Sequence, residues 1–258
     1  MLTLRPFRPI QIEAEMPGHR GPGVLVVFEG IDGAGKTTQV EMLESALRKA
    51  KEPVTRSKEP TNGSWGKKIR DSASTGRKSP REELKYFLYD REQHAQAIVR
   101  PALQRGEVVI LDRYYYSTIA YQGVRGLPVE KLHQMMKKKF LRPDVVFLLD
   151  ISPDVSIPRI RKRGDIPNEF ERIHNLEDAR DIFNSIRDTR IVKIDAAMSA
   201  KTVHKIVLEE FISGAFKKRR CFKQAYECDE PALCGYRMAG TCAWANSKLW
   251  QSKALLAK

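Results

Sequence analysis

The stretch VLVVFEGIDGAGKTT, residues 24–38, decides the fold of this chain. It opens with a continuous apolar run, residues 24–28, of the kind found in strands buried on both faces of a parallel sheet. Residues 30–37 match the pattern G-x-x-x-x-G-K-[ST], and a helical pattern follows over residues 36–50. A glycine-rich turn with a solvated lysine also fits these letters, but the position between a strand and a helix favours a phosphate-binding loop.

Each residue type in this loop has a physical task in holding a nucleoside triphosphate. Glycines let the backbone curl so that its N–H groups converge on phosphate oxygens, and the following helix directs its positive end at them. Lys36 can reach the β- and γ-phosphates, and the hydroxyl of Thr37 can coordinate Mg²⁺. We therefore expect the nucleotide to contact the whole loop: Gly30, Ile31, Asp32, Gly33, Ala34, Gly35, Lys36, Thr37 and Thr38.

The rest of the chain alternates short apolar runs with helical patterns. Residues 108–112 (VVILD), 145–150 (VVFLLD) and 191–194 are further β-branched, apolar runs that predict buried strands. Because helical patterns separate them, we expect an α/β fold with a central parallel sheet flanked by helices on both faces, over residues 23–214.

The longest predicted helix begins at Ser79 and runs towards Gly106. Ser79 is followed by Pro80 and then by Glu82, which together form a capping-box sequence. We expect Pro101 to kink or interrupt the last turns, because proline lacks a backbone N–H. Residues three or four apart give this helix an apolar stripe: Leu84, Leu88, Ala95, Ile98 and Ala102.

The composition describes a globular protein. The 258 residues are 41% hydrophobic and 30% charged, which is ordinary for a domain with a real core. No apolar run approaches the ~20 residues of a membrane span, and charged residues interrupt the N-terminus where a secretory signal needs an apolar stretch. Residues 1–220 contain no cysteine. We therefore expect a cytoplasmic protein with no membrane partner.

We expect three regions: an irregular, proline-rich leader (1–22), the α/β domain (23–214) and a C-terminal extension (215–258). The net charge is +14, and the extension carries +6 of it through nine Lys and Arg against three Asp and Glu. Zinc binding, nucleic-acid binding and no function at all stay open for the extension, although charge alone does not predict a nucleic-acid partner. The four cysteines of the chain all lie there: Cys221, Cys228, Cys234 and Cys242.

Three more stretches follow the loop in order: KEPTNGSWGKKIR (58–70), YFLYDREQH (86–94) and DRYYYSTIAYQG (112–123). Together with FEGIDGAGKTT (28–38), they resemble the ordered motifs of the thymidylate kinase family, and the resemblance runs through about residues 23–214. It implies a P-loop nucleoside-monophosphate-kinase fold, ATP as phosphoryl donor, dTMP as acceptor, Mg²⁺ as cofactor and a homodimer.

Arg91 occupies the missing position on the apolar stripe of the long helix. A charge that faces inward must bind a partner acid or line a polar ligand cavity. Phe87 lies four residues earlier, so its ring and the guanidinium share one face. The pair could be a core ring and a structural ion pair, but the resemblance implies that the two residues stack on thymine and bond to its edge.

Asp112 ends the apolar run of residues 108–112, and a carboxylate at this end of a strand faces the ligand crevice of a doubly wound sheet. The resemblance implies that Asp112 joins Thr37 in holding Mg²⁺ and that Arg113 clamps phosphates. Asp150 ends a similar run and is the alternative metal ligand.

Three residues are assigned to the acceptor's sugar and base by the resemblance alone. It implies that Asp32 holds the 3′-hydroxyl, although this acid could merely cap the loop. Tyr121 and Gln122 resemble family residues near the sugar and base. A bulky ring at Tyr121 would exclude a ribose 2′-hydroxyl and so favour a deoxynucleotide.

The sequence RIRKRG, residues 159–164, resembles the basic lid of bacterial-type thymidylate kinases, whose phosphate-binding loop lacks an arginine, as this one does. Such a lid neutralises charge on the transferred phosphoryl group. Basic residues also suit a helix C-terminus through its dipole. Arg159 and Arg163 share a helical face, and we expect these two to act catalytically together with Lys36, Asp32 and Arg113.

One position departs from the family pattern. Lys58 stands where the family's R-E-P segment has arginine, so the acceptor phosphate would meet a point charge in place of a bidentate fork. Activity could be weaker for this reason, or Arg56 or Arg70 could compensate.

The predicted reaction is ATP + dTMP giving ADP + dTDP. It needs no general base, because the acceptor phosphate, with its second pKa at about 6, is already largely dianionic at neutral pH. Two alternatives remain: a kinase for dUMP or UMP, and a non-catalytic P-loop module whose basic extension binds nucleic acid.

Overall fold

The computed structural model of the chain describes residues 23–162 and 173–216. Within them, five strands form one parallel sheet in the order β2-β3-β1-β4-β5. The connection from β1 leads to β2 on one side of β1, and the connection from β3 leads to β4 on the other side. A ligand crevice forms at the carboxyl ends of the strands where the direction reverses in this way. The strands are β1 (Val24–Glu29), β2 (Val54–Lys58), β3 (Val108–Asp112), β4 (Val145–Asp150) and β5 (Ile191–Asp195).

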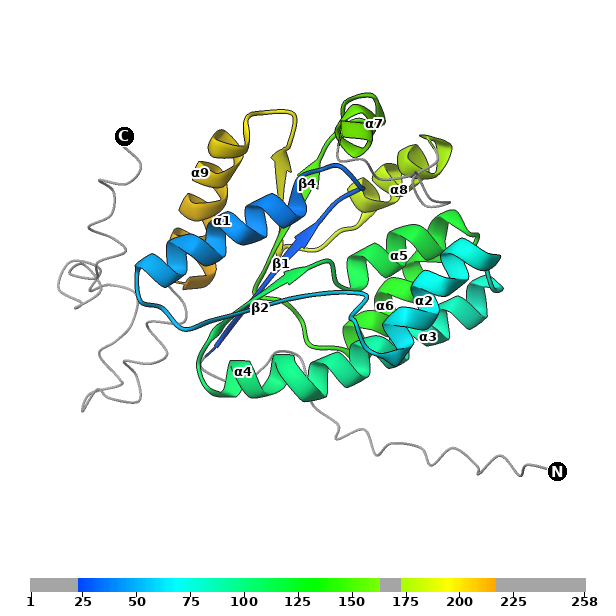
Figure 1. The fold of residues 1–258 in the computed structure, drawn as a ribbon, viewed down its shortest axis with the longest axis horizontal. Helices are drawn as coiled ribbons and strands as arrows, with labels where there is room; N and C mark the ends of the chain where they lie inside the picture. The colour runs from blue at the N-terminus through cyan, green and yellow to red at the C-terminus, as the bar shows by residue number, and fades with distance from the viewer. Residues whose placement is uncertain (1–22, 163–172, 217–258) are drawn as a thin grey trace.

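Helices cover both faces of the sheet (Figure 1). On one face α1 (Lys36–Lys49) and α9 (Ala200–Phe211) lie side by side. Helix α7 (Pro153–Lys162) follows the carboxyl end of β4 and contacts α8. The other face carries α2 (Ser64–Thr75), α3 (Pro80–His94), α4 (Arg100–Gln104), α5 (Tyr115–Val124), α6 (Val129–Lys139) and α8 (Ile173–Ser185).

In the part of the chain that the structure describes, no helix is both long and apolar enough to cross a bilayer.

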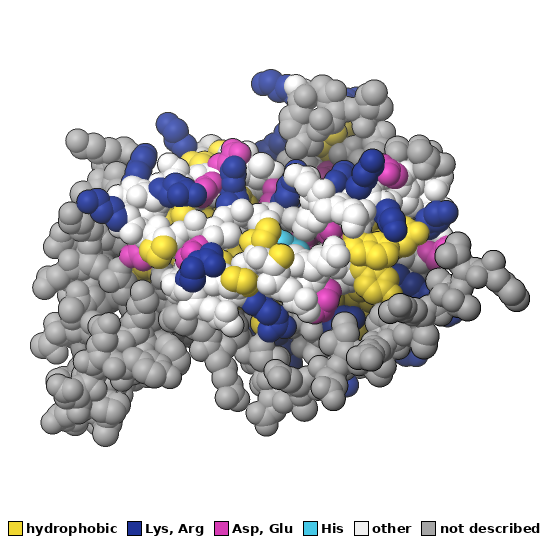
Figure 2. All heavy atoms as spheres, turned by 60° about the horizontal axis from the view of Figure 1, so that its bottom comes forward, with side chains coloured by type: hydrophobic (Ala, Val, Ile, Leu, Met, Phe, Trp, Pro, Cys, Tyr) yellow, Lys and Arg dark blue, Asp and Glu magenta, His cyan; other side chains and the backbone are white. Residues whose placement is uncertain are grey.

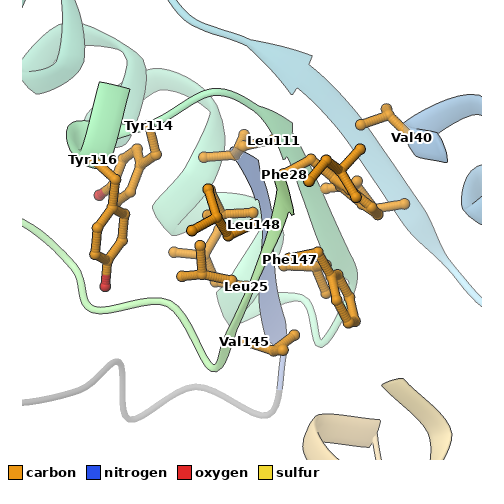
Figure 3. Close-up of a cluster of buried hydrophobic side chains, with 14 of the residues drawn as sticks. Leu25, Phe28, Val40, Leu111, Tyr114, Tyr116, Val145, Phe147 and Leu148 are labelled. Atoms are coloured by element: carbon orange, nitrogen blue, oxygen red, sulfur yellow. The ribbon is translucent and has the colours of Figure 1, made fainter. Parts of the chain in front are cut away.

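Side chains of the central strands are buried on both faces, as their unbroken apolar runs predict. Figure 3 shows Phe28 and Phe147 on one side of these strands, with Leu25, Leu111 and Leu148 on the other. The two phenylalanine rings lie 5.2 Å apart between centroids, across the β1–β4 pair. This core fixes the strand ends from which the site is built.

The structure confirms the four predicted strands and the start of the long helix. The Ser79 side chain accepts from the Glu82 backbone N–H, and the Glu82 carboxylate accepts from the Ser79 N–H, so the capping box is present. The sequence analysis missed β2, whose sequence VTRSK is neither apolar nor alternating. An edge strand is covered on fewer sides, so it needs no continuous apolar run.

The interruption of the long helix lies earlier than expected. A π-helical segment, η1 (Ala95–Val99), separates α3 from α4, and Pro101 lies in the first turn of α4. A π-helical turn contains an additional residue, so the buried face shifts by one position within the segment. The prediction was therefore wrong for Ile98, which is 41% exposed, whereas Val99 is 1% exposed.

The last described helix continues past the predicted domain boundary at residue 214. It is a second π-helical segment, η3 (Ile212–Phe216), and the Phe216 ring packs 5.2 Å from that of Phe211. The predicted leader (1–22), the predicted catalytic Arg163 and the cysteine-bearing residues 217–258 lie outside the described residues.

Candidate active site

Backbone conformations that suit glycine shape the loop between β1 and α1. Gly30 and Gly33 have φ values of +136° and +78°, which other residues rarely adopt. A Cβ atom at Gly33 would lie 2.6 Å from the carbonyl oxygen of Ser156, and one at Gly30 would collide with that of Leu149. Since α7 and the end of β4 press on the loop this closely, only glycine fits at both positions. The loop lines a cavity of about 730 Å³, here called the donor cavity.

Lys36 lies at the floor of the donor cavity with its ammonium group turned back onto the loop. Its Nζ donates to the carbonyl oxygens of Gly30, at 3.0 Å, and Ile31, at 2.7 Å. Burial, together with the nearby charge of Arg113, lowers the pKa of Lys36 to about 8. A poorly solvated cation of this kind gains strongly from an anionic partner.

Thr37 and Asp112 meet at the mouth of the same cavity, which both residues line. The Thr37 hydroxyl donates to Oδ2 of Asp112 at 2.6 Å. The parallel register pairs Asp112 of β3 with Phe28 of β1, which brings this carboxylate beside the start of the loop. A hydroxyl and a carboxylate oxygen are hard donors of the kind that Mg²⁺ prefers, so this pair fits that ion.

Arg113 follows Asp112 and joins the loop to α5. Its φ of +71° is unusual for a residue with a side chain and indicates strain of the kind that clusters at functional sites. The guanidinium donates to Asp32 Oδ1 at 2.6 Å and to Ser117 Oγ at 3.0 Å. The Tyr121 hydroxyl donates to the other oxygen of Asp32 at 3.1 Å. Burial alone would raise the pKa of Asp32, but Arg113 and Lys36 outweigh it and lower the pKa to about 2.

A second cavity of about 440 Å³, the acceptor cavity, opens beside the first. Phe87, Arg91 and Tyr121 line it, as the sequence analysis expected of the base and sugar site. Four residues line both cavities: Asp32, Lys58, Glu59 and Arg113. The two spaces therefore share a wall of charged side chains next to the phosphate-binding loop.

Arg91 has both features predicted for an inward-facing charge, a partner acid and a position on a ligand cavity. Its guanidinium is buried and donates through Nε to Glu59 Oε2 at 2.7 Å, so it has a partner acid. It also lines the acceptor cavity and donates to Thr118 Oγ1 at 2.9 Å.

Sequence comparison places this geometry among known proteins. The sequence model described as thymidylate kinase matches residues 28–207. The chain belongs to this family. A thymidylate kinase of Xanthomonas campestris pv. campestris strain B100 is 48% identical over 182 residues, covering 70% of this chain and 79% of that protein. One of Xanthomonas oryzae pv. oryzae strain PXO99A has the same identity and coverage, and one of Xylella fastidiosa strain M12 is 48% identical over 187 residues, covering 72% and 85%.

Gln122 and Asp150 lie away from the cavities of this thymidylate kinase family member. Gln122 is fully buried and its Nε2 donates to Glu83 Oε2 at 2.6 Å, so its amide serves the packing of α5 against α3. Asp150, the alternative metal ligand, is bonded to Arg180 at 2.7 Å and to Lys193 at 3.1 Å. Neither residue lines the donor or the acceptor cavity.

The described part of the predicted lid contributes two basic residues to the lining of the donor cavity. Arg159 and Lys162 line this cavity, and Arg159 donates to the carbonyl oxygen of Ala196 at 3.0 Å. Arg161 is exposed and does not line it. The sequence analysis did not name Lys162, because the shared helical face favoured the arginines Arg159 and Arg163.

The structure also distinguishes the two arginines that could support Lys58. Arg70 lines the acceptor cavity together with Lys58, and its NH1 donates to the carbonyl oxygen of Thr61 at 2.7 Å. Arg56 is instead bound to Glu41 and Glu44 on α1, both at 3.1 Å.

Glu29 is a site residue that sequence reasoning missed. It ends β1, is fully buried, and accepts from the backbone N–H of Tyr114 at 2.8 Å and from Ser117 Oγ at 2.6 Å. It therefore holds the turn that carries Arg113. Burial raises the pKa of Glu29 to about 7, against the lowering effect of these bonds. The signal for Glu29 in the sequence was a single acidic residue at the end of an apolar strand.

Proposed function

We propose that this protein transfers the γ-phosphate of ATP to dTMP, giving ADP and dTDP. The observation that supports this proposal best is that two adjacent cavities share one wall. The wall consists of Asp32, Lys58, Glu59 and Arg113. A triphosphate on the loop and a nucleoside monophosphate in the acceptor cavity would meet at this wall. An enzyme contributes to phosphoryl transfer almost entirely through such positioning and through electrostatic stabilisation.

On the donor side, backbone N–H groups of the loop and the ammonium of Lys36 bind the β- and γ-phosphates. Arg159 and Lys162, which line the same cavity, neutralise charge on the transferred group. Thr37 and Asp112 would hold Mg²⁺, which when bound neutralises phosphate charge. The loop residues 30–38 remain the proposed ATP contacts.

On the acceptor side, Lys58, Arg70 and Arg113 bind the phosphate of dTMP. The ring of Phe87 stacks on thymine, and Arg91 donates to its edge. Asp32 stays ionised at neutral pH because its pKa is about 2, and it can accept from the 3′-hydroxyl while it orients Arg113 and Tyr121. Tyr121 fills the space that a ribose 2′-hydroxyl would need.

We also propose a homodimer, in line with the family resemblance. Aromatic side chains gather on the outer side of α2 and α3, where the Trp65 ring lies 4.7 Å from that of Tyr89 and 5.7 Å from that of Tyr86. Tyr89 is 36% exposed, and Figure 2 shows a hydrophobic patch on the side where these helices lie. Light scattering after gel filtration should give twice the mass of the chain, and a monomer at micromolar concentration would contradict the proposal.

Further proposals concern the extent and place of the kinase domain. We propose that it spans residues 23–216, because Phe216 packs on Phe211 two residues past the boundary expected from sequence. The cytoplasm is the proposed compartment, because residues 1–220 contain no cysteine, which suits a reducing environment.

The test of the proposed function is ADP formation from Mg-ATP with dTMP, dUMP, UMP and AMP compared side by side. We expect dTMP to have the highest kcat/KM, with UMP the poorer pyrimidine because of its 2′-hydroxyl. An enzyme that binds ATP yet turns over none of the four, or prefers UMP, would overturn the proposal.

A further inference from the structure

A buried network lies behind the acceptor cavity and joins β2 to α3. At its centre is Glu59, which directly follows β2 and whose backbone N–H donates to the carbonyl oxygen of Asp112 at 3.1 Å. One carboxylate oxygen accepts from Arg91 Nε at 2.7 Å, and the other lies 3.0 Å from His94 Nδ1. His94 Nε2 in turn lies 2.8 Å from Ser57 Oγ. Both oxygens of Glu59 are thus engaged by α3.

The contacts of His94 are compatible with one neutral tautomer. With a proton on Nδ1, the ring donates to Glu59, and Nε2 accepts from the hydroxyl of Ser57. A histidine held at both nitrogens fixes the carboxylate that it faces, in the way that second-layer groups orient functional side chains. His94 is itself buried, so water does not compete for these bonds.

The same contacts fix Arg91 and leave part of it available. A guanidinium has five N–H donors. Glu59, Thr118 and the sulfur of Met136, the last at 3.7 Å from NH1, account for three of them. The rings of Tyr114 and Phe140 each lie 5.1 Å from the guanidinium carbon and limit its rotation. Arg91 lines the acceptor cavity, so its remaining N–H donors are available to a ligand there.

Charge explains why a carboxylate is needed at this point. Arg91 is 1% exposed, and a buried cation without a partner is strongly unfavourable. A thymine base is neutral and cannot supply the missing charge. Glu59 lines the acceptor cavity but would repel a dianionic phosphate, so its carboxylate fits a partner for Arg91 better than a substrate ligand.

We infer that Glu59 and His94 are positioning residues that hold Arg91 for recognition of a pyrimidine carbonyl. This inference rests on the proposed function. Glu59 neutralises Arg91 and fixes its plane, and His94 fixes Glu59, so that the remaining N–H donors meet a 4-oxo base such as thymine. Cytosine carries an amino group at that position and would meet donor with donor, so the network also contributes to rejecting dCMP.

The test compares Glu59→Gln with the wild-type enzyme and with Glu83→Gln as a matched control. Glu83 is also a buried carboxylate bound to arginines, Arg77 and Arg125, but it lines neither cavity. For Glu59→Gln we expect KM for dTMP to rise about 10- to 100-fold, with KM for ATP unchanged. The dTMP-to-dCMP ratio of kcat/KM should fall about tenfold. Glu83→Gln should lower thermal stability and leave both KM values and the ratio unchanged.

A merely structural network would give a different result. Glu59→Gln would then lose stability and active fraction, as Glu83→Gln does, with KM for dTMP and the substrate ratio at wild-type values, and the inference would be overturned. If Glu59→Gln does not fold, the milder His94→Gln decides, with an expected rise of about threefold in KM for dTMP and none for ATP. Absence of dTMP turnover by the wild type overturns the proposed function itself, and this inference with it.

Discussion

The donor and acceptor cavities of this protein are built in different ways. The donor cavity has the continuous residues 32–39 as its largest lining segment, with further side chains from the ends of β2 and β3, from α7 and from residues 196–203. Its lysine, Lys36, bonds to carbonyl groups only five and six residues earlier. The acceptor cavity is lined by side chains from separate elements, and the Arg91–Glu59 and Arg113–Asp32 pairs span 32 and 81 residues. A local backbone motif therefore forms the centre of the first site, whereas the second has no such continuous segment and depends on ion pairs between distant residues.

The largest effect is expected from a substitution that impairs the donor cavity alone. In Lys36→Met, the side chain stays unbranched and only one atom shorter but loses the charge that binds the β- and γ-phosphates. We expect kcat to fall about a thousandfold, while the affinity for dTMP stays within twofold of wild type. Steady-state kinetics and dTMP calorimetry measure the two quantities. An equal loss in dTMP affinity would show that the two cavities are not separate in the way described.

The next largest effect is expected from a substitution that impairs the acceptor cavity alone. Phe87→Ala removes the ring that we propose to stack on thymine, and KM for dTMP should rise about 10- to 100-fold. KM for ATP should stay within twofold, and Phe87→Tyr, which keeps the ring, should behave like wild type. A lower kcat with unchanged KM for dTMP would instead assign Phe87 to the core.

The pH dependence separates the cavities without a mutation. Lys36 has a pKa of about 8 in the free protein, so it is charged below that pH and loses its proton above it. We therefore expect KM for ATP to rise between pH 7 and pH 9, by about tenfold at pH 9, with a smaller change in KM for dTMP. A flat KM for ATP over this range would contradict the role given to the ammonium group.

The smallest effect sharpens the account of the acceptor phosphate. Lys58→Arg restores the fork that the family pattern has at this position, and KM for dTMP should fall by about threefold. Arg56→Lys is the matched control, because Arg56 is bound to Glu41 and Glu44 and lines neither cavity. A change of similar size in the control would remove the specific role of Lys58.

The same contrast explains how far the sequence alone could predict this molecule. The phosphate-binding loop, the apolar strands and the Ser79 capping box each depend on residues that are close in the sequence. The sequence alone therefore predicted them. The edge strand β2 and the shift of the buried face at Ile98 depend on sheet position and on a π-helical turn, which leave no periodic signal.

The acceptor site was only partly predictable for a related reason. Phe87 and Arg91 were found from their spacing on one helix and from family motifs. Glu59 and His94, which hold Arg91, lie on two elements that come together only in the fold. Gln122 illustrates the opposite case. The family resemblance named it together with Tyr121, but neighbouring residues of a helix point in different directions, and the Gln122 amide faces Glu83 of α3.

The most direct test of the two-cavity account is the affinity of one compound that reaches both sites. Adenosine and thymidine joined through a polyphosphate bridge would place one base in each cavity, with the bridge along the shared wall. In calorimetry with Mg²⁺, we predict binding at least about a hundredfold tighter than that of ATP or dTMP alone, and weaker binding to both Lys36→Met and Phe87→Ala. Affinity no better than that of the tighter single nucleotide would contradict the account.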